Sequence, residues 1–273
     1  LKHYASVPFI KAVVEQRSVK SEEEIEEIEK ALDITYQIHL EAMKSVRPGL
    51  KEYEVAGILQ GKAFSLGGRL SFPLIFSVHG EILHNPFQLN EMQKGQLLVI
   101  DCGGEAPSRY AGDITRTLPV TGKFSEEQKA VYQIVLNAQT TAIEMIKPGI
   151  KYRDVHLEAA KVITLGLKEL GLMKGNIEEA VQAGAHALFF PHGLGHMMGL
   201  DVHDMEDLGE DYVGYDEKIK RSDQFGLAYL RLARELKPGF VLTVEPGIYF
   251  IPQLIDLWQK DNKFSQFINY ERL

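Results

Sequence analysis

A segment near the start of the chain recurs 100 residues later, and this internal repeat constrains the fold more than any other feature. Residues 42–55 (AMKSVRPGLKEYEV) align with residues 142–155 (AIEMIKPGIKYRDV), with identical Ala, Pro, Gly, Lys and Val. Residues 95–101 likewise align with residues 239–245, in the same order along the chain. Self-similarity of this kind indicates a fold built from two similar units. The sequence therefore predicts two similar halves related by a pseudo-twofold axis.

Each copy of the repeat begins with a pair of predicted helices. Ser21-x-x-Glu24 and Ser125-x-x-Gln128 fit capping boxes, and a Pro-Gly pair ends the first helix of each copy. Apolar spacing predicts helices over residues 21–47, 53–66, 125–146, 152–170 and 177–188, with a shorter one near 227–236. Strands are predicted over residues 70–78 and 240–250, and residues 1–19 are predicted to be an extended linker with strand character.

Residues 97–117 place two carboxylates on neighbouring predicted strands. An apolar run leads into Asp101, a turn-rich stretch follows, and Asp113 begins a second extended run, which is the pattern of a β-hairpin. A buried charge must be paired or must bind a metal, so a cation between the two carboxylates is one interpretation. In the alternative interpretation, one Asp is a turn residue and the other pairs with Arg109 or Arg116.

The second copy of the repeat adds further candidate ligands. Glu245 occupies the position that Asp101 has in the first copy, and His196 lies in a glycine-rich segment that also contains His192. A ligand set of oxygens with one or two imidazoles favours Mn, Co, Fe or Zn over a thiolate zinc site. Three carboxylates and a histidine exceed the needs of one ion, so two ions roughly 3.5–4 Å apart are the better hypothesis. The candidate ligands are Asp101, Asp113, His196 and Glu245, with His84, His192 and His203 nearby.

Other polar or sulfur-containing residues have structural interpretations. His39, His156 and His186 are predicted to be helix-surface or core residues, and Met197-Met198 is predicted to be packing. Cys102 follows Asp101 on a strand, so its side chain is expected on the opposite, core face.

Composition argues against several classes of protein. The net charge of −8 comes without a basic stripe, which disfavours a nucleic-acid partner. No apolar run approaches the roughly 18 residues of a membrane span. The single cysteine cannot form an internal disulfide, which fits a reducing, cytoplasmic compartment.

Four motifs, in order, resemble those of the pita-bread metallopeptidases, in the branch of aminopeptidase P and prolidase. They are DITRT at 113–117, PHGLGH at 191–196, GLDVHD at 199–204 and TVEPGIYF at 243–250. The resemblance covers nearly the whole chain from about Ser18. It implies a duplicated α+β pita-bread fold with two divalent metal ions, usually Mn²⁺, with Co²⁺, Zn²⁺ or Fe²⁺ as alternatives.

The resemblance also implies roles for the candidate metal ligands. Asp101 would chelate one ion, and Asp113 would bridge both ions. His196 and Glu245 would bind the other ion, and Glu245 would also accept a proton from the nucleophilic water.

Further roles concern the substrate. His84 and His203 would hydrogen-bond the substrate or the tetrahedral intermediate, and His192 would help line the substrate pocket. Arg221 matches a position at which prolidase is thought to bind the dipeptide carboxylate. A surface arginine is the alternative interpretation of that residue.

The resemblance implies two missing parts. Residues 1–19 would be a linker from an absent amino-terminal domain, and residues 20–273 would be the catalytic domain without its C-terminal strand. That strand carries a fifth ligand, a Glu, in the family pattern, and Glu271 lacks the strand context for this role. Metal affinity is therefore expected to be weakened, and inactivity of this fragment stays open.

The resulting hypothesis is a proline-specific metallo-exopeptidase. It would be an Xaa-Pro aminopeptidase that removes the N-terminal residue before proline by attack of a metal-bridged hydroxide. The alternatives are an Xaa-Pro dipeptidase (prolidase) and a non-catalytic peptide-binding module of the same fold. Expected partners are proline-containing peptides or dipeptides, with neither nucleic acid nor membrane, and the full-length protein is expected to be a homo-oligomer, such as a dimer.

Overall fold

The computed structural model describes residues 6–273 and divides into two compact units. Unit 1 comprises the described residues up to 19, residues 127–196 and residues 205–273. Unit 2 comprises residues 20–126 and 197–204. Each unit contains one copy of the helix pair predicted from the repeat.

The helix pair of unit 2 consists of α2 (Glu22–Ser45) and α3 (Glu52–Ser65). The predicted capping box begins α2: the Ser21 hydroxyl accepts a hydrogen bond from the Glu24 N–H, and the Glu24 carboxylate accepts one from the Ser21 N–H. Gly49 turns the chain between the helices at a φ of +89°, a conformation that favours glycine. Both predicted helices are thus confirmed.

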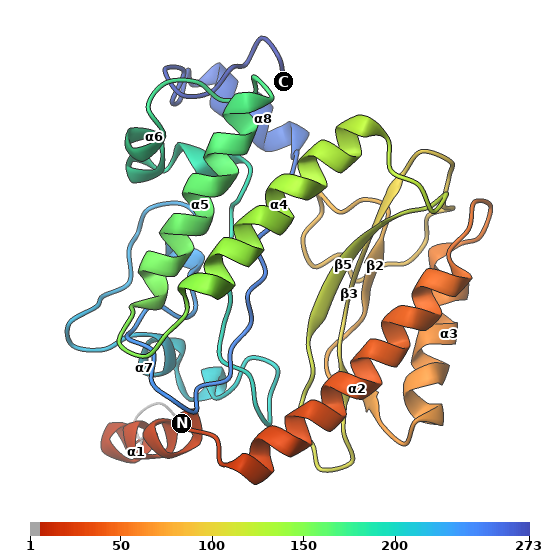
Figure 1. Ribbon diagram of the computed structural model, residues 1–273, viewed down its shortest axis with the longest axis vertical. Coiled ribbons are helices and arrows are strands. Elements are labelled where there is room, and N and C mark those ends of the chain that lie inside the picture. Colours follow the sequence, from red (N-terminus) through yellow and green to blue (C-terminus); the bar gives the residue numbers. More distant parts are fainter. Residues whose placement is uncertain (1–5) are drawn as a thin grey trace. The chain divides into compact units, whose positions relative to one another are not determined.

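Two antiparallel sheets complete the regular structure of unit 2. The larger has the strand order β2 (Ile75–Ser77), β3 (Leu97–Cys102) and β5 (Ile114–Pro119), and the smaller pairs β1 (Arg69–Leu70) with β4 (Gly104–Glu105). Helices α2 and α3 pack against one face of the larger sheet (Figure 1), where Ile38, Leu59 and Ile100 are fully buried. Burial alternates along β3, so Ile100 and Cys102 point into this core while Asp101 lies on the other face.

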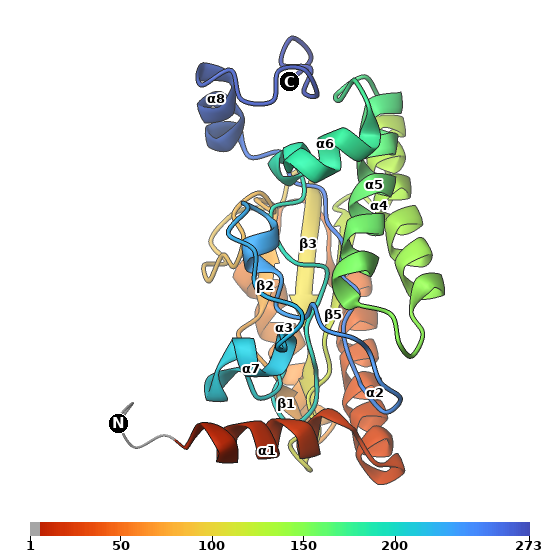
Figure 2. The same ribbon diagram turned by 90° about the vertical axis from the view of Figure 1, so that its left-hand side faces the viewer.

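Unit 1 is mainly helical. Its elements are α1 (Val7–Ser18), α4 (Glu126–Met145), α5 (Tyr152–Glu169), α6 (Ile177–Ala183), α7 (Glu210–Gly214) and α8 (Pro252–Lys260), with 3₁₀ helices at Ala185–Leu188, Glu206–Leu208 and Leu227–Tyr229. Helices α4 and α5 lie side by side (Figures 1 and 2). Gly166 permits this approach, because a Cβ there would lie 2.5 Å from Ile134.

The predicted linker over residues 1–19 is wrong over its described part, which forms helix α1. Ser6 caps the helix by accepting a hydrogen bond from the Phe9 N–H, and Pro8 lies in the first turn, where its missing N–H costs nothing. The valines and Phe9 gave this segment strand character in the sequence, but the cap and the proline favour a helix. Residues 1–5 lie outside the described part of the chain.

Three other predictions need correction. The predicted helix near 227–236 is only a 3₁₀ helix over Leu227–Tyr229. The helix predicted over 177–188 is divided at Gly184, which adopts a φ of +89°. Residues 240–250 form no regular strand. The N–H groups of Thr243 and Glu245 donate to the glycine-rich segment 194–196, and Pro246 has no N–H to continue a ladder.

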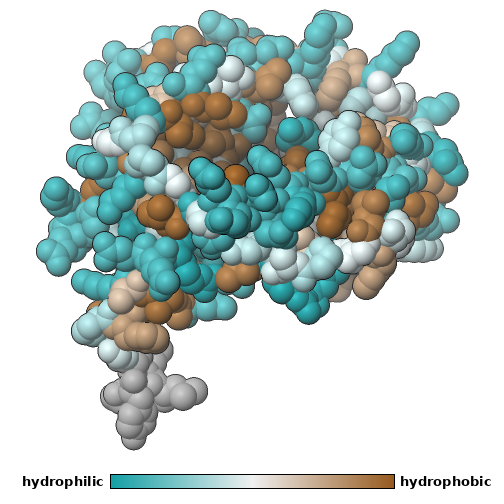
Figure 3. All heavy atoms as spheres, turned by 60° about the horizontal axis from the view of Figure 1, so that its bottom comes forward, coloured by the Kyte–Doolittle hydropathy of each residue, from teal (hydrophilic) through white to brown (hydrophobic). Residues whose placement is uncertain are grey.

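Apolar side chains are interspersed with polar ones on the face drawn in Figure 3. Among the described residues, no helix has both the length and the apolar character needed to cross a membrane.

Candidate metal centre

In unit 2, the paired strands β3 and β5 bring the two candidate carboxylates to one face. Asp101 lies opposite Thr115 in the register, and the Thr115 hydroxyl donates a hydrogen bond of 2.9 Å to Asp101 Oδ1. Asp113 precedes Thr115 by two residues, the spacing that returns to the same face of an extended chain. The predicted hairpin, with one carboxylate at each strand, is confirmed, although Asp113 lies just before β5.

His39 of α2 contacts both strands, β3 and β5, on the core face of the sheet. Its Nε2 donates a hydrogen bond of 2.8 Å to the carbonyl of Ile114, which can only accept, and lies 3.4 Å from Cys102 Sγ. Both side chains are buried, and this burial lowers the pKa of His39 and raises that of Cys102. The predictions that His39 and Cys102 belong to the core are confirmed.

The arginines offered as alternative partners of the two aspartates have contacts elsewhere. Arg109 pairs with Glu105 at 2.9 Å, and Glu105 also pairs with Arg69 at 2.7 Å. Arg116 donates a hydrogen bond to the Thr115 carbonyl. These contacts weaken the interpretation in which either arginine neutralises an aspartate.

In unit 1, two short segments place His196 beside Glu245. The Thr243 N–H donates to the His196 carbonyl at 3.0 Å, and the Glu245 N–H donates to the Leu194 carbonyl at 2.8 Å. Glycine is required at 195, because a Cβ there would lie 2.1 Å from the Thr243 carbonyl oxygen. The close approach leaves His196 Nε2 3.2 Å from Glu245 Oε1.

This spacing fits a shared divalent ion. Two donor atoms that are each about 2.1 Å from one ion lie about 3.0–3.4 Å apart when they subtend roughly 90–109°. Burial alone would raise the pKa of Glu245, but the hydrogen bond and charge of His196, the charge of His192 and the Thr243 hydroxyl hold it below its ordinary value. His196 and Glu245 together offer an imidazole nitrogen and a carboxylate oxygen, which are the donor atoms of Mn, Co, Fe or Zn sites.

Side chains from two helices hold the segment that carries Glu245. The Tyr152 hydroxyl, at the start of α5, donates to the Thr243 carbonyl at 2.5 Å, and Gln139 Nε2 of α4 donates to the Val244 carbonyl at 2.8 Å. The Thr243 hydroxyl donates to Glu245 Oε1 at 2.7 Å. Sequence analysis assigned no role to Tyr152, Gln139 or Thr243. Tyr152 lies within the repeat and Thr243 begins the TVEPGIYF motif, and these positions were the available signals.

His192 has a partner that the sequence analysis also missed. Its Nδ1 donates to the Gly193 carbonyl at 2.8 Å, because a carbonyl can only accept, and the Tyr249 hydroxyl lies 3.1 Å from its Nε2. The Tyr249 ring folds back over Gly247, where a Cβ would lie 2.6 Å from the ring. The tyrosine of the TVEPGIYF motif thus orients His192.

The other two predicted substrate histidines lie in irregular segments of unit 2. His84 is exposed, with a φ of +55°, between β2 and β3. His203 is half-buried and precedes Asp204, whose carboxylate is 2.6 Å from the Lys20 ammonium group. Both side chains of that ion pair are almost completely buried, which anchors the segment containing His203.

Arg221, the predicted carboxylate clamp, has several contacts within unit 1. Its guanidinium donates to Asp211 at 2.8 Å, to Glu210 and to the Ala228 carbonyl at 2.9 Å. It also lies 4.6 Å from the centre of the Tyr215 ring. Nearby Arg231, which the sequence analysis passed over, forms ion pairs with Glu206 and Glu210.

His156, His186, Met197 and Met198 are packing residues, as predicted. His156 and His186 are fully buried, with ring centroids 6.3 Å apart, and Met197 and Met198 are nearly inaccessible.

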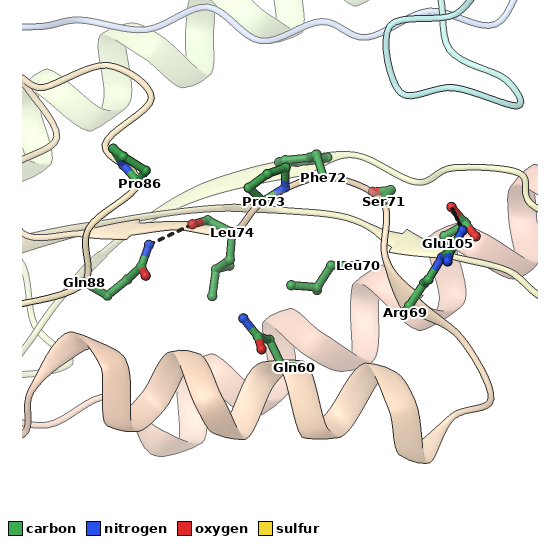
Figure 4. Close-up of a pocket in the computed structure, with 10 residues that line it drawn as sticks. All are labelled: Gln60, Arg69, Leu70, Ser71, Phe72, Pro73, Leu74, Pro86, Gln88 and Glu105. Atoms are coloured by element: carbon green, nitrogen blue, oxygen red, sulfur yellow. Dashed lines mark hydrogen bonds and ion pairs between the residues drawn. The ribbon is translucent and has the colours of Figure 1, made fainter.

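A pocket of about 600 Å³ lies in unit 2 beside α3 (Figure 4). Leu70 and Leu74 line it together with Gln88, whose amide donates to the Leu74 carbonyl at 2.9 Å. None of the predicted site residues is among those that line it.

Comparison with known proteins defines the class to which these features belong. Residues 26–269 match the model of metallopeptidase family M24, and the chain belongs to this family. The fold also matches the structure of Escherichia coli aminopeptidase P with the inhibitor Pro-Leu, with a TM-score of 0.78 at 38% identity over 90% of this chain and 52% of that one. The predicted α+β pita-bread fold is thereby confirmed.

Two curated relatives carry different names. The human Xaa-Pro dipeptidase is 39% identical over 96% of this chain and 53% of its own length. The Xaa-Pro aminopeptidase of Escherichia coli strain K12 is 38% identical over 88% of this chain and 50% of its own length. The chain thus spans about half the length of these relatives.

Proposed function

We propose that this chain is the catalytic part of a metal-dependent Xaa-Pro aminopeptidase, which removes an N-terminal residue that precedes proline. The observation that carries the proposal is the pair of His196 and Glu245, 3.2 Å apart at a spacing suited to one metal ion. Membership of metallopeptidase family M24 and 38% identity to an enzyme named Xaa-Pro aminopeptidase support it.

The proposed ligands are Asp101, Asp113, His196 and Glu245, holding two divalent ions, with Mn²⁺ as the first choice. Asp113, His196 and Glu245 each offer a carboxylate oxygen or an imidazole nitrogen. When bound, such ions lower the pKa of water and polarise a carbonyl, which is the chemistry of peptide hydrolysis. Glu245 would take the proton from the attacking water, since its lowered pKa keeps it ionised at neutral pH.

Three histidines complete the proposed site. His84 and His203 would donate hydrogen bonds to the charge that develops on the scissile carbonyl oxygen. His192 would line the substrate pocket with its ring oriented by Tyr249.

An Xaa-Pro dipeptidase is the second candidate. It is favoured by the match to the human dipeptidase, which covers 96% of this chain against 88% for the bacterial aminopeptidase. The contacts of Arg221 with Glu210, Asp211 and two carbonyls weigh against it, because they occupy the guanidinium that would bind a dipeptide carboxylate. A non-catalytic module ranks third, because both units retain their proposed ligands.

A cytoplasmic location and a homo-oligomeric full-length protein are also proposed. The buried, unpaired Cys102 fits a reducing compartment.

The test compares hydrolysis of Gly-Pro, Gly-Pro-Ala and a longer Xaa-Pro peptide by the full-length protein with added Mn²⁺. Cleavage of the longer peptides supports an aminopeptidase, whereas turnover confined to Gly-Pro supports a dipeptidase. Glu245→Ala is expected to lower kcat at least 1,000-fold, as estimated from losses on removing essential catalytic groups. Exposed Glu235→Ala is the matched control, expected to keep full activity. Absence of cleavage by the metal-loaded wild type would leave the binding module as the remaining candidate.

A further inference from the structure

In each unit, the hydroxyl of a threonine donates a hydrogen bond to the carboxylate of one proposed ligand. In unit 2, Thr115 Oγ1 donates to Asp101 Oδ1 at 2.9 Å. In unit 1, Thr243 Oγ1 donates to Glu245 Oε1 at 2.7 Å. The same type of contact therefore occurs at both of the carboxylates that the repeat aligns, although the two threonines are not aligned with each other.

The direction of the Thr243 hydroxyl is fixed by its surroundings. Its oxygen accepts a hydrogen bond of 3.0 Å from the His196 N–H. Because a hydroxyl has one proton, that proton is left to point at the Glu245 carboxylate, which can only accept. One side chain thus bonds to the backbone of one proposed ligand and to the side chain of another.

Thr243 is itself held in place by polar groups from the helices. Its carbonyl accepts the hydroxyl proton of Tyr152, which is completely buried, and the next carbonyl accepts from Gln139. The absence of a Cβ at Gly195 permits the close contact with residue 243. The threonine is therefore a fixed donor, as needed to orient a carboxylate.

Thr115 is fixed by a different device. It lies within β5, directly opposite Asp101 on β3, and the β-branched side chain has few accessible rotamers on a strand. Opposite residues in an antiparallel pair have Cβ atoms about 4.5–5.5 Å apart, so the hydroxyl reaches the carboxylate without distortion.

We infer that Thr115 and Thr243 are positioning residues for the metal centre. Each hydroxyl donates to one oxygen of a carboxylate and so fixes the rotation of that carboxylate, which sets how its two oxygens face an ion. In Glu245 the oxygen that Thr243 holds, Oε1, is also the one 3.2 Å from His196 Nε2. This inference rests on the proposed function, because it requires Asp101 and Glu245 to be metal ligands. Loss of a group that orients a ligand typically weakens metal binding by about 10–100-fold.

The experiment measures Mn²⁺ binding by isothermal titration calorimetry on the full chain. Thr243→Val and Thr115→Val keep the branched shape without the hydroxyl, and each is expected to bind Mn²⁺ about 10–100-fold more weakly. Thr243→Ser and Thr115→Ser restore the donor and are expected to bind within about threefold of wild type. Thr117→Val, on the same face of the same strand, is the matched control and is expected to bind as wild type.

A second readout separates positioning from general stability. Visible absorption of the Co²⁺-loaded protein reports the geometry around the ion, so its bands are expected to shift in both valine variants and to return in the serine variants. Melting temperatures without metal show how far each variant is destabilised. If Thr243→Val does not fold, the Thr115 series carries the test.

The outcomes distinguish this inference from the proposed function. Wild-type-like Mn²⁺ affinity and Co²⁺ spectra in folded valine variants would overturn the inference while leaving the metal site intact. Equal losses in the serine and valine variants would also overturn it, since the hydroxyl would then not be the active group. A wild-type chain that binds neither ion would instead refute the metal site itself.

Discussion

The helix pairs of the two units have the same turn and the same backbone bonds to a later segment. Gly49 and Gly149 have φ angles of +89° and +88°, and their N–H groups donate to the carbonyls of Met92 and Leu236. The residues that begin α3 and α5 donate likewise to Asn90 and Arg234. These partners are 144 residues apart, the offset at which residues 95–101 align with residues 239–245. The repeat seen in the sequence is therefore a repeat of hydrogen bonding.

The buried faces of the helix pairs also correspond. The first helix of each pair buries a stripe at intervals of four residues, and the second helix buries a comparable set. The aligned buried pairs are Ile34 and Ile134, Ile38 and Ala138, Ala42 and Ala142, Val55 and Val155, Leu59 and Ala159, and Ala63 and Ile163. Large and small residues are exchanged between the copies, so the packing positions are shared while the side chains that fill them differ.

The units differ where the candidate ligands are placed. Unit 2 sets Asp101 on a regular strand, where ladder bonds hold the backbone. Unit 1 sets Glu245 on a segment without a ladder, whose carbonyls are bonded by Tyr152 and Gln139. The same helix pair thus accompanies a carboxylate that is held by sheet register in unit 2 and by buried polar side chains in unit 1.

The largest testable difference between the units concerns α3 and α5, the second helices of the two pairs, and the effect of low pH on the free energy of unfolding. Position 56 is a buried Ala in unit 2, and its counterpart is His156. Burial, with the nearby charges of His186 and His192, lowers the pKa of His156 to about 3, and burial lowers that of His186 to about 4. Within the described part of the chain, both ring nitrogens of His156 and both of His186 lack a hydrogen-bond partner.

The sign of the pH effect follows from these lowered values. Above about pH 6.5 both rings are neutral whether the chain is folded or not. As the pH falls below that value, the unfolded chain takes up protons that the folded chain excludes, so stability declines toward pH 4. Each histidine is expected to remove about 2 kcal/mol between pH 6.5 and 4.5. Urea denaturation at several pH values measures this decline.

His156→Leu sharpens this test. The substitution is expected to preserve stability at pH 7, because it removes two buried nitrogens without partners, and to reduce the acid-induced loss by about half. His79→Leu, which removes an exposed imidazole, is the matched control and is expected to change the free energy of unfolding little at pH 7. An unchanged acid slope in His156→Leu would contradict a neutral, buried His156.

The sequence predicted the elements whose signals are local. Capping, helical spacing and Pro-Gly turns located α2, α3, α4 and α5 within a few residues, and the alternation over 97–117 located the hairpin with Asp101 and Asp113. Each of these patterns is complete within its own segment, so no distant contact was needed to interpret it.

The errors have physical reasons of two kinds. For α1, β-branched residues outweighed a single capping Ser and a proline. For residues 240–250, an apolar run suggested a strand, yet its bonds go to a glycine-rich segment and to two helices, and such tertiary partners leave no periodic trace. The partners of the Thr243 and Tyr249 hydroxyls were missed for the same reason, since the motif that contains both residues does not indicate which groups they contact.

The polar residue that begins the second helix gives the next test. Glu52 is completely buried, and its carboxylate accepts hydrogen bonds from the Val78 N–H and from Asn90. Glu52→Gln places an NH₂ group against these donors and is expected to lower the free energy of unfolding by about 2–3 kcal/mol. Tyr152→Phe, at the aligned position, removes one donor and is expected to cost about 1 kcal/mol.

Urea denaturation of both variants checks these values, with exposed Glu29→Gln as a control that should change little. Tyr152→Phe should also weaken Mn²⁺ binding, whereas Glu52→Gln should act mainly on stability. If both substitutions lowered the free energy of unfolding equally, the several hydrogen bonds that Glu52 accepts would contribute no more to stability than the single bond of Tyr152, which would contradict the expected difference.

The smallest effect is expected where the two units agree most closely. Gly49 and Gly149 have the same left-handed φ, and a Cβ at either position would meet no atom within 4 Å. The cost of Gly→Ala is therefore backbone strain alone, about 1 kcal/mol at each site. Because strain depends on φ and not on the surrounding side chains, Gly49→Ala and Gly149→Ala should lower the free energy of unfolding equally. A difference above about 0.5 kcal/mol would show that one turn relaxes to accommodate the alanine and that the two copies differ in rigidity even where their geometry matches.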